Sequence, residues 1–394
     1  MLDAFALDPS VTHLNHGSFG AVPRAVAEAQ LGFRRQAEAN PMRFFRVEAP
    51  ALKVSAREAA GRLLGVGPDE VALVRNVTTG IATVLAALVQ QQRLGADDVV
   101  VLHEQAYESV KRTVRHWCAL TGATMRVVGI DIDATDDQVV SCYRRAFEEV
   151  ATHGQQLRLV VVDAITSATG SVLPAAAVSA AARAAGGLVF VDAAHVPGHV
   201  EARPAASGAH FWSGTWHKWG FAPRGTTALW AAEDERDRLV PLTTSWNHGQ
   251  PFPLPFDATG TDDFSGWFAL GAAAEFWRGA GGLEIAERGR GLLADGAAVV
   301  DAALAATGLP RTDVRLPARS APCLRLVALP DGVASDEAAA DRLYAALSSL
   351  RVEAQVTSYD GRGWVRLSGA VYNEPADYER LAEVLPRLMP GRPT

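Results

Sequence analysis

A lysine and an aspartate in the middle of the chain are the residues best suited to covalent chemistry. Asp192 ends the apolar run 188–192. This run predicts a buried strand that carries the carboxylate to the edge where open α/β sheets bind ligands. Lys218 follows after enough residues for a turn and a second strand to return it to that edge. Its neighbours Trp216 and Trp219 disfavour the charged ammonium, so we expect a lowered Lys218 pKa.

These two residues match the needs of pyridoxal phosphate, which requires a lysine for a Schiff base and an acid that keeps the pyridine nitrogen protonated. His195 follows shortly after Asp192 and could hydrogen-bond the ring hydroxyl. Taken singly, Asp192 is more often a helix cap or part of an ion pair, and Lys218 is more often a solvated surface residue. Together, with the aromatic residues around the lysine, they favour the cofactor.

The cofactor phosphate needs amide and hydroxyl donors. The segment VTTG offers Thr78, Thr79 and Gly80 at the start of the helix expected after the first strand. Helix N-termini bind anions through free N–H groups and the helix dipole. On its own, this segment is more often an ordinary N-cap, and it indicates a phosphate site only beside Lys218. Thr215 and His217, which precede the lysine, could complete the phosphate site.

Aromatic residues and one arginine extend the candidate site. The segment HEQAYES offers His103 or Tyr107 as a platform over the pyridine face, and we expect Tyr107 to serve, the alternative being a core aromatic. Arg366 lies in GWVRLSG and has the fork geometry to hold a substrate α-carboxylate, the alternative being a surface salt bridge.

Metal and serine-hydrolase chemistry fit the sequence poorly. His195 and His199 have the spacing of a zinc-binding helix, but Pro197 and Gly198 lie between them and no HExxH is present. The segments GSFG and SGTW do not match the GxSxG of a nucleophile elbow. We therefore expect neither a metal nor a serine nucleophile.

Alternating short apolar runs and longer amphipathic stretches predict the elements that position these residues, and they indicate an α/β fold with a mostly parallel mixed sheet. In the first part of the chain we expect strands at 71–76, 98–103, 125–130, 158–163 and 188–192. After about Gly282 we expect a long helix, then strands at 323–328, 351–356 and 364–368, and helices at 335–350 and 375–389.

This change of pattern predicts the domain organisation. We expect an N-terminal segment, residues 1–20, that contributes to the active-site entrance. A large α/β domain over residues 21–281 and a smaller α+β domain over residues 282–394 follow.

Composition excludes several classes of protein. The 394 residues are 48% hydrophobic and 21% charged, which is typical of a globular chain and not of collagen, a coiled coil or a disordered protein. The net charge is -7 with scattered basic residues, so we expect no nucleic-acid partner. Three cysteines without disulfide or zinc spacing, no signal peptide and no long uninterrupted apolar segment predict a cytoplasmic protein that does not cross a membrane.

Six motifs in order resemble the class V aminotransferase family of fold-type I pyridoxal phosphate enzymes, and in particular its isopenicillin N epimerase-like branch. The resemblance spans nearly the whole chain and implies an aspartate aminotransferase-like fold. It is carried by LNHGSFG (14–20), RNVTTG (75–80), TSATG (166–170), VDAAH (191–195), WHKWG (216–220) with APRG (222–225), and VRLSGAVYNEPADYERL (365–381).

The resemblance implies roles for individual residues. Lys218 would form the Schiff base, Asp192 would pair with the pyridinium, His195 would contact the ring hydroxyl, and Arg366 would anchor the substrate carboxylate. The other expected cofactor-binding residues are Thr78, Thr79, Gly80, Tyr107, Thr166, Thr215 and His217.

The resemblance also implies a homodimer with shared active sites. The segment ATGTDD resembles one that family members insert into the neighbouring subunit's site, so Gly260 and Thr261 would complete the phosphate site across the dimer. The expected substrate entrance is formed by residues 15–20 with Asn15 and His16, residues 41–46 with Arg43, and residues 246–248 with His248.

The expected mechanism begins when an amino acid displaces Lys218, which then removes the Cα proton as a general base. The shape of the pocket decides which reaction follows removal of this proton. We expect C–S β-lyase chemistry on a bulky, conjugated amino acid of specialised metabolism first, with epimerisation, transamination or decarboxylating deamination as alternatives. Persulfide-forming desulfuration is disfavoured because Cys323 lies in an apolar strand. A cofactor-sensing regulator is disfavoured because the N-terminal region shows no helix-turn-helix.

Overall fold

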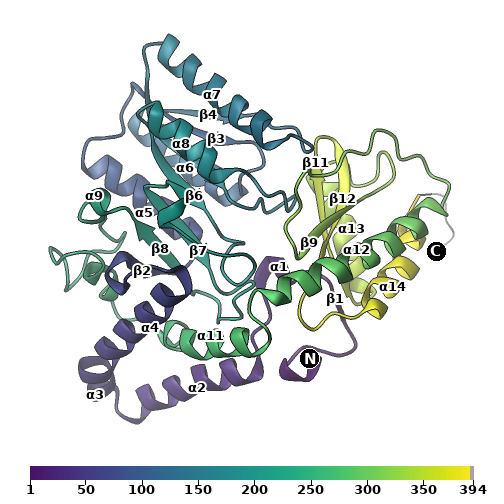
Figure 1. The fold of residues 1–394 in the computed structure, drawn as a ribbon. Helices are drawn as coiled ribbons and strands as arrows, with labels where there is room; N and C mark the ends of the chain where they lie inside the picture. The colour runs from purple at the N-terminus through teal and green to yellow at the C-terminus, as the bar shows by residue number, and fades with distance from the viewer. Residues whose placement is uncertain (391–394) are drawn as a thin grey trace.

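The structure is a computed structural model and describes residues 1–390. Its largest element is a seven-stranded sheet in the order β2-β8-β7-β6-β5-β3-β4 (Figure 1). β8 runs antiparallel to both of its neighbours, and the other strand pairs in the sheet are parallel. The strands are β2 (Val71–Val74), β3 (Asp98–His103), β4 (Thr124–Val128), β5 (Gln156–Asp163), β6 (Leu188–Asp192), β7 (Phe211–Thr215) and β8 (Thr227–Ala231).

The central strands are apolar along their whole length because helices cover both faces of the sheet. Every residue of β3, β6, β7 and β8 is buried. Helices α5 (Val77–Gln90) and α6 (Glu108–Thr121) share one core with one face of the sheet. The opposite face packs against α4 (Ala49–Leu64), α7 (Asp136–Thr152), α8 (Ala175–Ala184), α10 (Ser265–Phe268) and α11 (Leu270–Gly279).

The C-terminal part is built on a second, antiparallel sheet in the order β11-β12-β9. Its strands are β9 (Leu324–Ala328), β11 (Gln355–Tyr359) and β12 (Arg362–Ser368). A separate apolar core fills this part and includes residues of α12 (Glu284–Ala305), α13 (Glu337–Ser349) and α14 (Pro375–Val384). From β12, Arg366 reaches the turn that follows β5 and the N-terminal segment.

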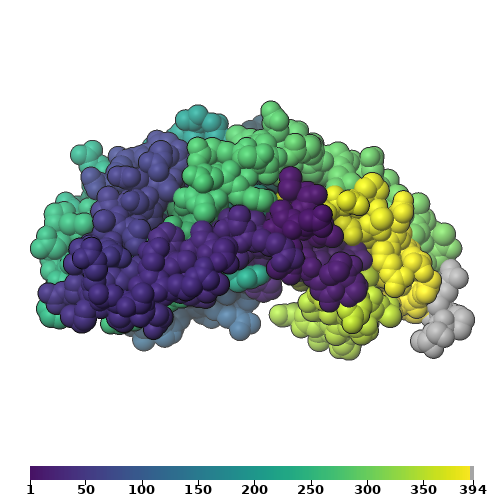
Figure 2. Space-filling model, turned by 90° about the horizontal axis from the view of Figure 1, so that it is seen from below, coloured from purple at the N-terminus to yellow at the C-terminus, as the bar shows by residue number. Residues whose placement is uncertain are grey.

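The N-terminal segment joins the two parts. Its strand β1 (Thr12–His13) pairs in parallel with β10 (Val352–Glu353) of the C-terminal part. The chain then continues into α1 (His16–Phe19), α2 (Arg24–Ala39), α3 (Pro41–Arg43), a π-helical turn (Phe44–Glu48) and α4. Figure 2 shows these purple residues running across one face of the molecule, from the yellow C-terminal helices to α4.

The remaining helices are short. They are α9 (Glu233–Arg236) and the 3-10 turns Leu2–Ala4, Pro68–Glu70, Ala205–Ser207, Leu254–Asp257 and Leu385–Leu388. Within residues 1–390, no helix combines the length and the apolarity needed to cross a bilayer.

The predicted fold class is confirmed, with local differences in element bounds. The strand expected at 351–356 is two strands, because the chain leaves its partner β1 at Ala354 and joins β12 instead. The helix expected to end at 389 ends at Val384, because Pro386 lacks an amide hydrogen and continues only as a 3-10 turn. The division into domains at residue 281 stays a prediction, and the last four residues of the expected small domain lie outside the described residues.

Candidate active site

The side chain of Lys218 lies in the turn after β7, among cationic and aromatic neighbours. Its Nζ is 3.0 Å from Nε2 of His195. Burial, followed by the positive charge of Arg366, lowers the pKa of Lys218. A larger neutral fraction follows, and only a neutral amine can attack a carbonyl or accept a proton.

Asp192 ends β6 as a buried carboxylate that makes no ion pair within residues 1–390. Its exposure is 3%, and Oδ1 accepts a hydrogen bond of 2.9 Å from the Ala194 amide. Burial raises the pKa of Asp192, and the charge of Asp163, its register partner on β5, raises it further. Among residues 1–390, no basic side chain lies within 4 Å in an ion pair with Asp192. A buried carboxylate of this kind is stabilised by a cationic group that enters the site.

Asp163 is already engaged by a histidine that sequence analysis offered as a ring platform. Nε2 of His103 lies 3.1 Å from Oδ1 of Asp163, and His103 is fully buried at the end of β3. Tyr107 stands at the N-cap of α6 with 48% of its surface exposed, near enough to Arg366 to raise the pKa of that guanidinium. The ring of Tyr107 is therefore the more accessible of the two.

Arg366 on β12 is a buried guanidinium whose hydrogen-bond partners are all uncharged. Its Nη2 donates to Oδ1 of Asn15 at 3.0 Å and to Oγ of Ser18 at 2.9 Å, and Nη1 donates to the carbonyl of Ser167. Nε has no hydrogen-bond partner in the described part of the chain, and burial lowers the pKa of Arg366 to about 10. A buried cation with a free donor and no carboxylate partner favours an incoming anion.

The first turn of α5 lies directly against β7. Asn76 caps this helix, with Oδ1 accepting a 2.8 Å hydrogen bond from the Thr79 amide. A Cβ on Gly80 would lie 2.8 Å from Oγ of Ser213, so only glycine permits this close approach. Thr78 and Thr79 stand in the first helical turn, where the helix dipole favours an anion, although the Thr79 amide already donates to Asn76.

A hydroxyl–imidazole cluster lies at the end of β7. Oγ1 of Thr215 is 2.7 Å from Nδ1 of His217 and accepts a 2.8 Å hydrogen bond from Thr227. Burial lowers the pKa of His217 to about 4, so the imidazole is neutral near pH 7. Thr227 was missed by sequence analysis, although it faces Thr215 in the β7–β8 register.

The N-terminal segment brings two of the expected entrance residues to the site. Asn15 contacts Arg366, and Nε2 of His16 lies 2.9 Å from the backbone carbonyl of Lys218. Burial lowers the pKa of His16 to about 4. Gly20 makes this packing possible, because its φ is +65° and a Cβ there would collide with the His217 carbonyl at 2.0 Å. Within the expected entrance segment 15–20, residues His16–Phe19 form the helical turn α1.

Two further expected residues, Thr166 and Arg43, take other positions in this chain. Thr166 is fully buried and lies 2.6 Å from the Thr169 hydroxyl, so its side chain is used within its own turn. Arg43 lies in α3 and pairs with Glu48 at 2.9 Å, with 65% of its side chain exposed. Figure 1 shows α3 at the opposite end of α2 from α1.

His248, Gly260 and Thr261 lie in exposed turns of the segment 241–263. The His248 amide donates to the Ser245 carbonyl at 2.9 Å. An ion pair between Asp262 and Arg75 holds the Gly260–Thr261 turn beside the residue that precedes the cap of α5. Within residues 1–390, no hydrogen bond joins Arg43, His248 or Thr261 to the groups around Lys218.

Two of the three cysteines are buried in places unsuited to nucleophilic chemistry. Burial raises the pKa of Cys118 to about 11 and that of Cys323 to about 12. A thiolate is the reactive form of cysteine, so the raised pKa values make Cys118 and Cys323 poor nucleophiles. Cys142 is half-buried on α7.

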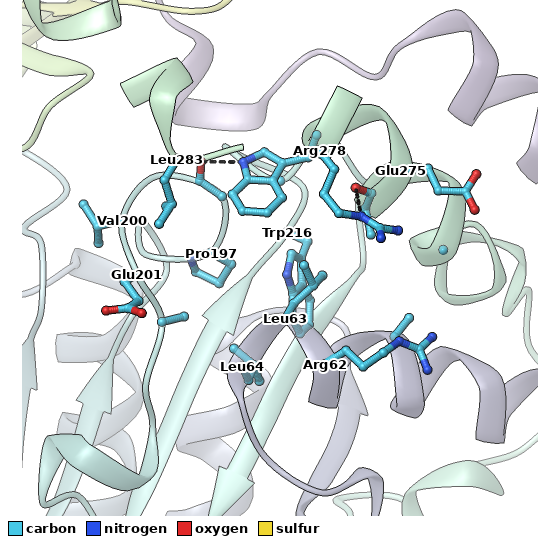
Figure 3. Close-up of a pocket in the computed structure, with 17 residues that line it drawn as sticks. Arg62, Leu63, Leu64, Pro197, Val200, Glu201, Trp216, Glu275, Arg278 and Leu283 are labelled. Atoms are coloured by element: carbon cyan, nitrogen blue, oxygen red, sulfur yellow. Dashed lines mark hydrogen bonds between the residues drawn. The ribbon is translucent and has the colours of Figure 1, made fainter. Parts of the chain in front are cut away.

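A cavity of about 400 Å³ lies behind the lysine turn (Figure 3). Trp216 and Gly220 line it, together with Trp277 and Arg278 of α11. None of Lys218, Asp192 and Arg366 lines this cavity, so it is separate from the site described above.

Sequence comparison places the chain beside enzymes of amino-acid metabolism. The family model for aminotransferase class-V matches residues 20–305. The isopenicillin N epimerase of Amycolatopsis lactamdurans is 30% identical over 405 residues, covering 97% of this chain and 96% of the relative. The putative L-cysteine desulfhydrase 1 of Oryza sativa subsp. japonica is 30% identical over 411 residues, covering 97% and 84%.

Solved structures share the fold at low sequence identity. The apo cysteine desulfurase from Thermococcus onnurineus NA1 has a TM-score of 0.79 at 19% identity, covering 99% of this chain and 97% of that one. The cystine C–S lyase C-DES, solved with cysteine persulfide, has a TM-score of 0.74 at 18% identity, covering 97% and 99%. A C-DES mutant carries glycine covalently linked to the pyridoxal phosphate cofactor, with a TM-score of 0.76 at 19% identity and coverage of 96% and 97%.

Proposed function

This chain belongs to the class V aminotransferase family and is a pyridoxal 5'-phosphate enzyme, and on that premise we propose that it is a C–S β-lyase. The proposed substrate is an amino acid with a bulky sulfur substituent on Cβ. The epimerase and desulfhydrase names of its relatives support chemistry at Cα and Cβ.

The residues present fit the cofactor and an amino-acid substrate, because three buried polar groups make no ion pair within residues 1–390. The Asp192 carboxylate suits the protonated ring nitrogen, the Lys218 amine suits the aldehyde, and the guanidinium of Arg366 suits the substrate carboxylate. We propose that Thr78, Thr79, Thr215 and His217 hold the phosphate. When bound, pyridoxal phosphate supplies an electron sink for bonds broken at the substrate Cα.

The proposed steps use the chain's own groups. Arg366 holds the substrate carboxylate and so orients the Cα–H bond toward Lys218, whose neutral Nζ accepts the proton. Asp192 keeps a proton on the ring nitrogen. The Cβ–S bond breaks with its electron pair on sulfur, which leaves as a thiol once protonated. Water then releases pyruvate and ammonia, which balances the reaction.

One observation carries the choice of elimination over epimerisation. The hydrogen-bond partners of Arg366 are Asn15, Ser18 and the Ser167 carbonyl, groups that do not exchange protons with carbon. Epimerisation needs a proton delivered to the opposite face of Cα, and we propose Lys218 as the single base. Tyr107, close to Arg366, and Phe19, next to Ser18 in the chain, are 48% and 69% exposed, and we propose that they contact the bulky sulfur substituent.

The experiment that tests this proposal incubates the enzyme with cysteine conjugates and α-amino acids in deuterated water. Pyruvate and a free thiol are the products expected. Recovered substrate with deuterium at an inverted Cα would instead indicate an epimerase. An oxo acid together with pyridoxamine phosphate would indicate an aminotransferase. Either result, if no pyruvate forms, contradicts the lyase proposal. The Lys218→Ala variant controls for non-enzymatic elimination.

Arg366→Ala is expected to lower kcat/KM about 10- to 100-fold while leaving the cofactor absorption spectrum intact. The expected loss corresponds to a hydrogen bond to a charged group, about 1.5–3 kcal/mol. Steady-state kinetics and absorption spectra check both parts. Arg362 is a matched control, because it lies on the same strand and pairs with Asp331 at 2.9 Å. Unchanged kinetics in Arg366→Ala would refute the anchoring role.

We further propose a homodimer that shares its active sites. Large apolar side chains are exposed in the segments that carry Arg43 and His248, with Met42 70% and Trp246 95% exposed. A second copy would cover these surfaces and bring Gly260 and Thr261 to the neighbouring phosphate. Sedimentation of the active enzyme is expected to give twice the chain mass, and a fully active monomer would contradict this arrangement.

A further inference from the structure

The orientation and tautomer of His195 are determined by a tryptophan beside the lysine. Nε1 of Trp219 lies 3.3 Å from Nδ1 of His195 and donates to it, and both residues are buried. An indole N–H is only a donor, so Nδ1 must be the acceptor and carry no hydrogen. In the neutral ring the hydrogen then resides on Nε2. Because a hydrogen on Nδ1 would face the indole N–H, this contact also disfavours the doubly protonated ring.

The second nitrogen of His195 faces the lysine. Nε2 is 3.0 Å from Nζ of Lys218, within hydrogen-bond distance. An N–H at Nε2 can only donate, and an ammonium has three donors and no acceptor. A hydrogen bond therefore forms only when Nζ has a free lone pair. The Nε2–H of His195 would also be the donor available to the ring hydroxyl of the cofactor.

A second histidine fixes the backbone that carries His195. The Cys323 amide donates to Nε2 of His199 at 2.8 Å, so Nδ1 of His199 carries the hydrogen and donates to the His195 carbonyl at 3.0 Å. The ring of His199 also stacks on Trp219, with 4.4 Å between ring centroids. His195 is therefore held by His199 at its backbone carbonyl and by Trp219 at its ring, and His199 is itself held by the Cys323 amide.

We propose that Trp219 is a positioning residue that holds His195 as the Nε2–H tautomer, and that this tautomer favours the neutral amine of Lys218 before cofactor binding. The His195 tautomer does not depend on the proposed function. Its effect on cofactor binding does, because that effect requires Lys218 to be the lysine that binds the cofactor. The other charged groups around the amine are Arg366, which also disfavours its proton, and Asp192 and Asp163, which favour it.

Nitrogen-15 NMR of the enzyme, before and after cofactor removal, tests the tautomer directly. The His195 signals are identified by their absence in His195→Gln. In the wild-type protein we expect a bound hydrogen at Nε2 and none at Nδ1. A hydrogen on Nδ1 of wild-type His195 would overturn the proposal, whatever the variants do.

Trp219→Phe keeps the stacked ring and removes the indole N–H. We expect a mixture of His195 tautomers in this variant. We also expect cofactor-free protein to recombine with pyridoxal phosphate more slowly at pH values below the Lys218 pKa. The recombination rate should fall tenfold for each unit by which that pKa rises. Unchanged His195 signals together with an unchanged pH profile of recombination would overturn the proposal.

Trp277→Phe is the matched control. Trp277 donates its indole N–H to the Gly198 carbonyl at 3.1 Å. Gly198 lies in the loop that carries His195, but this hydrogen bond does not involve the His195 ring (Figure 3). We expect wild-type His195 signals in this variant. Retention of the cofactor's visible absorption band in Lys218→Ala would refute the proposed function and leave the tautomer result intact, so the two failures are distinguishable.

Discussion

Lys218→Ala is expected to abolish the cofactor's covalent attachment and to lower turnover by roughly 10²–10⁴-fold or more, the contribution of a positioned general base alone. Lys218 is the one lysine with its amine against His195, and the pKa of that amine is lowered by burial. Absorption spectroscopy should show the visible band replaced by that of free or loosely bound cofactor, and single-turnover kinetics should show slow Cα deprotonation.

Two further variants make this result specific. Lys218→Arg keeps a positive charge and should lose the band as completely as alanine. Lys111→Ala removes a lysine that pairs with Glu108 at 3.0 Å, and we expect the band and turnover to be retained. A visible band that persists in Lys218→Ala would place the covalent bond on another residue.

Asp192→Asn is expected to lower kcat by roughly 10²–10³-fold, the usual cost of removing one preorganised charge-stabilising group. An amide cannot hold a proton on the ring nitrogen, so the negative charge that develops at Cα is no longer stabilised by a cationic ring. Asp192 is buried, and among residues 1–390 no ion pair offsets its charge. Kinetics with Cα-deuterated substrate check the prediction, because the isotope effect should increase as deprotonation becomes slower.

Asp163→Asn is the comparison for this variant. Asp163 ends the adjacent strand but faces His103 at 3.1 Å. Its removal should lower the Asp192 pKa, because a neighbouring negative charge is lost, and should cost far less in kcat. Equal losses in the two variants would contradict a specific role for Asp192.

The sheet and the residues at its edge could be predicted from sequence because their signal is local. The run 188–192 is apolar on both faces, and its expected bounds coincide with β6. The placement of Asp192 and Lys218 at one edge of the sheet then follows, because parallel strands end at the same edge. The cap of α5 was also visible as VTTG, although the capping side chain is the preceding Asn76.

The contacts of Arg366 could not be predicted, because they depend on long-range packing. Ser167 binds Arg366 through its backbone carbonyl, which no residue pattern encodes. Ser18 reaches Arg366 from a segment almost a full chain length away. Arg43 and His248 were expected at the entrance, but in this chain they lie in exposed segments, and their roles stay predictions that depend on a second copy.

The account depends most on Lys218 as the residue bonded to the cofactor. Borohydride reduction of the enzyme makes that bond permanent, and peptide mass spectrometry then locates it. The chain has only two other lysines, Lys53 and Lys111, so the result is unambiguous. We predict that the added mass of the cofactor lies on the peptide containing Lys218. Modification of Lys53 or Lys111 instead, or of no lysine in enzyme that shows the visible band, would contradict the account.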